Sequence, residues 1–102
     1  MTLGPLLAET SSALLAVQKA VRSPAQKRQI AAQLQQLLAL TGRLVDADVE
    51  RATPEYGAAT VALARAQRAL AAASDDLASV ARAIEATAGA IDLLTRLAAL
   101  AA

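Results

Sequence analysis

The sequence predicts an all-α protein, and three observations lead to that fold class. Alanine fills 29 of the 102 positions and leucine fills 17, and both residues favour helices. β-Branched residues are scattered along the chain, so no segment has the pattern of a strand. The C-terminal half carries aliphatic residues spaced by seven. We therefore expect one helical domain spanning residues 1–102.

The first helix is expected over about residues 5–22. Leu3, Leu7, Leu14 and Val21 fall on one face of that helix. A proline follows at position 24, and because a proline ring clashes with the carbonyl four residues earlier, the first helix must end or kink before it.

The second helix is expected over about residues 24–51. Ser23, Pro24 and Gln26 form a capping-box pattern, with serine at the cap and proline in the first helical position. Helical spacing then relates these aliphatic residues: Ile30, Leu34, Leu37, Leu38, Leu44, Val45 and Val49.

The third helix is expected over about residues 54–100, starting at Pro54 with Glu55 in its first turn. A seven-residue repeat runs along it without a slip, which is typical of a coiled-coil seam packed against a partner helix. The predicted interface residues are Tyr56, Leu63, Leu70, Leu77, Ile84, Ile91 and Leu94. The opposite heptad position is predicted to face solvent and reads Val61, Arg68, Asp75, Arg82, Gly89 and Arg96.

Helix lengths favour an elongated helical hairpin with coiled-coil-like packing. At 1.5 Å per residue the third helix spans roughly 70 Å, the second roughly 40 Å and the first under about 30 Å. A compact bundle of matched helices requires a break near Gly89. If the third helix is continuous, either the second helix folds back on its first half, or Pro24 only kinks a composite first helix. We favour the kink, since the Ser23-Pro24 joint leaves no loop for a reversal.

The composition argues against catalysis and against a nucleic-acid partner. The chain has no histidine or cysteine and no glycine-rich phosphate loop, so we expect no enzyme activity, no cofactor and no metal site. Its net charge of +1 lacks the basic excess with which proteins neutralise phosphates. The sequence shows neither a signal peptide nor a membrane-spanning segment, which predicts a cytoplasmic protein.

Charge is distributed unevenly between the two proline joints. The basic residues at the first joint are Lys19, Arg22, Lys27 and Arg28, and the acidic residues at the second are Asp46, Asp48 and Glu50. Both groups on the second helix oppose its dipole. They are candidates for electrostatic docking; the alternative interpretation is ordinary solvated charge of negligible energetic cost.

These observations favour a non-enzymatic protein–protein interaction module that self-associates through its long C-terminal helix. An assembly, scaffold, inhibitor or immunity-type role fits such a module, and another protein could be a further partner. The alternative function is an amphipathic helical protein that binds a lipid surface or forms pores. The alanine and arginine usage is typical of a GC-rich bacterial or bacteriophage source.

Overall fold

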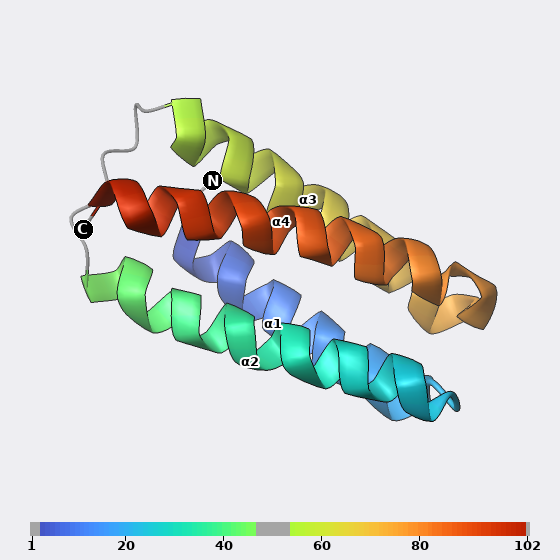
Figure 1. Cartoon of the computed structure of the whole chain (residues 1–102). Coiled ribbons are helices and arrows are strands. Elements are labelled where there is room, and N and C mark those ends of the chain that lie inside the picture. The colour runs from blue at the N-terminus through green and yellow to red at the C-terminus, as the bar shows by residue number, and fades with distance from the viewer. Residues whose placement is uncertain (1–2, 47–53, 102) are drawn as a thin grey trace.

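In the computed structural model, the described residues, 3–46 and 54–101, form four α-helices arranged as two helical hairpins (Figure 1). This arrangement confirms the all-α prediction. The elements in chain order are α1 (Leu3–Ala20), α2 (Pro24–Asp46), α3 (Pro54–Asp75), the short 3-10 turn η1 (Leu77–Ser79) and α4 (Val80–Ala101).

The two hairpins pack side by side into a four-helix bundle. Besides its hairpin partner, α1 lies beside α3, and α2 lies beside α4 (Figure 1). The bundle measures 39 × 19 × 18 Å, and its radius of gyration of 13.1 Å matches the roughly 13 Å of a compact 100-residue domain. The prediction of an elongated hairpin is therefore wrong.

The first proline joint reverses the chain. Helix α1 ends at Ala20, the residue whose carbonyl the Pro24 ring would meet in a continuous helix. The Gln26 N–H donates to Ser23 Oγ at 3.3 Å, which is the predicted serine cap of α2. Three residues suffice for the reversal because connections in helical bundles are commonly this short. Our preference for a kink at Pro24 is corrected: α2 folds back on α1.

The predicted 54–100 helix is interrupted at Asp76, and Gly89 lies inside the unbroken α4. The Asp76 side chain accepts a hydrogen bond from the Ala78 N–H at 3.0 Å, and the Asp76 carbonyl accepts one from the Ser79 N–H at 2.9 Å. Aspartate competes with helix in this way by bonding its own neighbouring backbone. The prediction of one long C-terminal helix is therefore wrong.

The core lies between all four helices and is almost purely aliphatic. Six alanines buried on the inner faces of α3 and α4 let these two helices pack closely: Ala59, Ala66, Ala73, Ala83, Ala90 and Ala98. The largest fully buried side chains include Leu7 and Leu14 of α1, Ile30 and Leu37 of α2, Leu63 and Leu70 of α3, and Leu94 and Leu97 of α4.

Polar contacts join the two hairpins. The buried Gln33 on α2 donates from Nε2 to the carbonyl of Ile84 on α4 at 2.8 Å. On the other side of the bundle, Gln67 Nε2 on α3 donates to Glu9 Oε2 on α1 at 2.9 Å. These contacts help to fix the α3–α4 hairpin against α1 and α2, and the outer side of that hairpin faces solvent.

Candidate interaction surface

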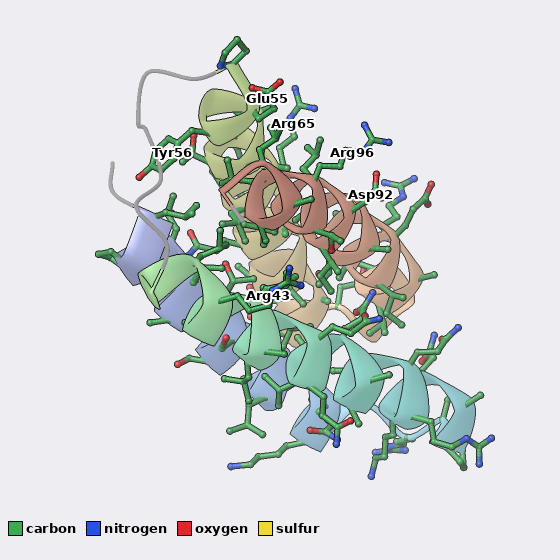
Figure 2. All side chains as sticks on the ribbon, turned by 60° about the vertical axis from the view of Figure 1, so that its left-hand side comes forward. Arg43, Glu55, Tyr56, Arg65, Asp92 and Arg96 are labelled. Carbon is green, nitrogen blue, oxygen red and sulfur yellow. The ribbon has the colours of Figure 1, made fainter. Side chains whose placement is uncertain are left out.

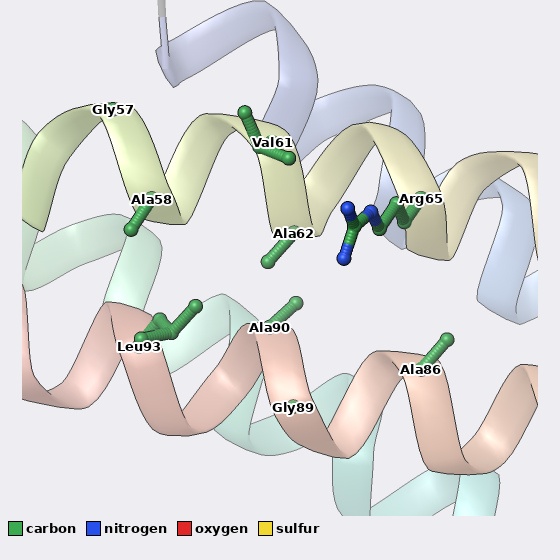
Figure 3. A pocket seen from close by; sticks show the side chains of 9 residues that line it. All are labelled: Gly57, Ala58, Val61, Ala62, Arg65, Ala86, Gly89, Ala90 and Leu93. Carbon is green, nitrogen blue, oxygen red and sulfur yellow. The ribbon is translucent and has the colours of Figure 1, made fainter.

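The outer side of the α3–α4 hairpin carries an open, mostly apolar groove (Figure 3). In Figure 3, Ala58 and Ala62 of α3 face Leu93 and Ala90 of α4 across it. The residues that line it are Gly57, Ala58, Val61, Ala62, Arg65, Ala86, Gly89, Ala90 and Leu93.

A second hollow continues this groove toward the start of α3 and the end of α4. The two hollows share Ala58 and Leu93, so they form one surface, which we call the α3–α4 groove. The residues that the second hollow adds are Pro54, Glu55, Arg96, Ala99 and Leu100.

Sequence spacing explains why these side chains share one side of the hairpin. On α4 the groove residues 86, 89, 93, 96 and 100 alternate by three and four, and on α3 residues 54, 58, 61 and 65 do the same. That alternation places residues in a row along one helix face. Each helix of the hairpin therefore carries two such rows: one faces the core, and the other borders the groove.

Large aliphatic side chains on the groove are open to water. Val61 is 52% exposed and Leu100 is 63% exposed, whereas Leu93 between them is half-buried. The floor consists of alanine and glycine, which leave the backbones of both helices accessible to a close neighbour. Contiguous exposed apolar surface of this kind marks interaction sites more often than ordinary solvent-facing surface.

The groove carries charges of opposite sign at different points along α3. Glu55 lies in the first turn of α3, and Arg65 lies ten residues further along the same helix. Among the described side chains, Arg96 and Asp92 on α4 form the one ion pair, at 3.2 Å, and both are well exposed. Figure 2 shows these four residues on the α3–α4 side of the molecule, while Arg43 lies on α2.

Six of the seven predicted seam residues lie in the chain's own core or pack against it. Five of them are buried: Tyr56, Leu63, Leu70, Ile91 and Leu94. Ile84 is half-buried and packs against that core. Leu77 lies in η1, and its side chain falls outside the described part of the structure. The seven-residue repeat is thus accounted for by packing between α3, α4 and the first hairpin.

The predicted basic residues gather at the tip of the α1–α2 hairpin. Lys19 lies in the last turn of α1, Arg22 lies in the connection to α2, and Lys27 and Arg28 lie in the first turns of α2, all four exposed. The acidic group cannot be placed beside them. Asp46 ends α2 but its side chain is not among those described, and Asp48 and Glu50 lie outside the described residues.

The described residues offer no arrangement for metal binding or membrane crossing. Within residues 3–46 and 54–101, no group of three or more Asp, Glu, His or Cys could hold a metal ion. No helix of this part is both long enough and apolar enough to cross a membrane.

The groove could not be predicted from the sequence, although several of its residues are where the heptad predicted them. Val61, Gly89 and Arg96 were predicted to face solvent, and all three are exposed. The signal for a second surface was Val61, a large aliphatic residue in an otherwise charged or small row. Val61 borders a groove only because the chain reverses at Asp76, which brings α3 and α4 together.

Comparisons with protein families, curated proteins and solved structures found no match to this chain.

Proposed function

We propose that this protein is a non-enzymatic helical interaction module that self-associates through the outer face of its α3–α4 hairpin. The observation that carries the proposal is the α3–α4 groove, with its floor of small residues and the exposed Val61 and Leu100. A helix-on-helix contact at this groove supports an assembly or scaffold role.

The sequence alone favoured self-association through the row of residues that faces the core, here called the inner row. We propose instead that the outer row, which borders the α3–α4 groove, carries it. The inner row is already packed within one chain, so it has no surface left to offer a second copy. The outer row keeps the same alternation of three and four residues but exposes its members to water. A helix that docks in an apolar groove carries its apolar anchors at this spacing.

A helix fits the α3–α4 groove better than a small molecule does. The main hollow holds about 540 Å³, which is within the range of small-ligand pockets of roughly 300–1,000 Å³. Such pockets, however, enclose most of their ligand and orient it with several convergent polar groups. Here the hollow is an open trough, and Arg65 supplies its one charged side chain.

The test compares two exposed aliphatic residues on different faces of the bundle. Val61 on α3 is 52% exposed inside the groove, and Leu38 on α2 is 55% exposed and belongs to neither hollow. We expect Val61→Asp to abolish self-association, because a carboxylate would be forced into an apolar interface, and Leu38→Asp to leave it unchanged.

The measurement is molar mass by light scattering after size exclusion, at two protein concentrations. The unmodified chain is expected to have about twice the 10.4 kDa of one chain, or a higher multiple, and Val61→Asp the mass of a single chain. Circular dichroism should show equal helicity for both variants, since both side chains point to solvent. An unmodified chain that stays at 10.4 kDa, or a Val61→Asp variant of undiminished mass, contradicts the proposal.

A further inference from the structure

The α1–α2 hairpin carries basic charge and no acid over a long stretch of the chain. Between Glu9 and Asp46 the sequence contains no aspartate or glutamate. The same stretch holds half of the chain's basic residues: Lys19, Arg22, Lys27, Arg28 and Arg43. All five are exposed, and among the described side chains none of them forms an ion pair. This hairpin therefore has an excess of positive charge, most of it at its tip.

Two rows of side chains combine this charge with exposed leucine. On α1, Leu15 and Lys19 are four residues apart, so they are neighbours on one face. On α2, residues 27, 31, 34 and 38 follow at intervals of four, three and four, which makes one row from Lys27 to Leu38. Leu15 is 42% exposed and Leu38 is 55% exposed. Both lysines lie close to the connection at residues 21–23, so the two rows are neighbours there.

Contacts with the other hairpin place both rows on one outer side of the bundle. At about 100° per residue, Leu15 lies about 120° around α1 from Glu9, which contacts α3. The row with Leu15 therefore points away from α3. Lys27 lies about 120° around α2 from Gln33, which contacts α4, so its row points away from α4. We call the two rows together the α1–α2 outer face; the α3–α4 groove lies on the opposite hairpin (Figure 1).

We infer that the α1–α2 outer face docks on the surface of a membrane that contains anionic lipid. Negative headgroups attract basic residues, and each one near the surface raises membrane affinity about fivefold. The leucines beside them enter the apolar boundary beneath the headgroups, while the long lysine stems keep their amines among the phosphates. The inference goes beyond the proposed function and does not rest on it, because this face and the groove belong to different hairpins.

A membrane surface fits this face better than a nucleic acid does. Phosphates of a nucleic acid would engage the basic residues and leave the exposed leucines in water. The one aromatic residue of the chain, Tyr56, is buried on α3, so the face has no ring on which a base could stack. A membrane uses both parts of the face, since charge attracts it to the headgroups and leucine inserts below them.

The test is flotation with vesicles of phosphatidylcholine, prepared with and without phosphatidylserine. The unmodified chain should float only with vesicles that contain phosphatidylserine. Lys27→Glu should lower the partition coefficient roughly tenfold or more, because it removes a base and adds an acid. The new acid lies near the start of α2, where the helix dipole tolerates it. Leu15→Gln keeps the charge and should weaken binding several-fold through the lost apolar contact.

Arg82→Glu is the matched control. It makes the same change of charge near the start of α4, on an exposed residue of the other hairpin, and should leave vesicle binding within about twofold of the unmodified value. Equal weakening by Lys27→Glu and Arg82→Glu would show that net charge alone acts, which overturns the inference. Circular dichroism of each variant should show unchanged helicity.

Further outcomes also decide the inference. Flotation that depends on phosphatidylserine and is lost in Lys27→Glu and Leu15→Gln supports it. No flotation of the unmodified chain, or equal flotation with both kinds of vesicle, overturns it, and so does binding to a DNA duplex without binding to phosphatidylserine vesicles. Light scattering of Lys27→Glu should give the molar mass of the unmodified chain, so a failure here leaves the proposed self-association standing.

Discussion

Tyr56 shows how one residue can fix the relation between two helices that are distant in the sequence. It is the only aromatic residue of the chain, and its ring is buried at 8% exposure. Its hydroxyl accepts a hydrogen bond of 3.0 Å from the N–H of Leu3, the first residue of α1. The first N–H groups of a helix have no partner within that helix, so Tyr56 on α3 satisfies one of them. The heptad pattern indicated that Tyr56 faces a neighbour; a partner 53 residues away cannot be inferred from local spacing.

Replacing Tyr56 by phenylalanine should lower the free energy of unfolding by about 1–3 kcal/mol, because a buried N–H at Leu3 would lose its acceptor. The ring remains in place, so the change adds no cavity. Urea unfolding followed by circular dichroism measures the effect as a shift in midpoint at constant slope. An unchanged midpoint would mean that the hydroxyl contributes nothing to joining α1 and α3.

At the scale of helices and turns, the sequence patterns that predicted the structure correctly were those that act on neighbouring residues. The serine cap and proline at Ser23-Pro24 start α2, and Pro54 starts α3, because caps and prolines act on their immediate neighbours. The prediction of a continuous 54–100 helix is wrong because an unbroken heptad does not require an unbroken helix. Ala73 and Val80 are seven residues apart and both are buried, although the turn lies between them. The repeat continues across the turn because α3 and α4 each bury their own heptad row against the same core.

The break itself was signalled by Ser74, Asp75 and Asp76, three consecutive residues that favour caps over helix interiors. Asp76→Ala removes the side chain that accepts the Ala78 N–H, and we expect it to lower the free energy of unfolding by about 1 kcal/mol. Asp75→Ala is the matched control. Asp75 is an acid at the C-terminal end of α3, where the helix dipole disfavours negative charge, so its removal should be neutral or slightly stabilising. Thermal melts should therefore show a lower midpoint for Asp76→Ala and an equal or slightly higher one for Asp75→Ala, and a larger loss for Asp75→Ala would contradict the capping role of Asp76.

At the scale of the whole molecule, compactness follows from the two reversals, each of which folds one helix onto another. Four helices of about twenty residues bury one aliphatic row each, and the inner alanines of α3 and α4 narrow the bundle to 19 × 18 Å in cross-section. The inner row could be assigned from the sequence, because helical periodicity identifies it. Which outer faces become neighbours could not be assigned, because that depends on where the chain turns. The α3–α4 groove lies between two such outer faces, so it could not be assigned from the sequence.

Gly89 connects the stability of the single chain to its association. It lies in the interior of α4, and a Cβ added there would meet no atom within 4 Å, so the fold of one chain does not require glycine at this position. Gly89→Ala should raise the free energy of unfolding of the monomer by about 1 kcal/mol through helix propensity.

The same substitution should weaken the dimer several-fold, because the added methyl group would occupy the floor of the α3–α4 groove where the second copy approaches. Gly42→Ala provides the control: Gly42 lies in α2, its Cβ also meets nothing within 4 Å, and it belongs to neither hollow of the groove. It should stabilise the monomer by a similar amount and leave the dimer Kd unchanged. Denaturant unfolding at low protein concentration and sedimentation velocity measure the two effects separately. A Gly89→Ala chain that is more stable and dimerises as tightly as before would show that no second copy lies over this part of the groove.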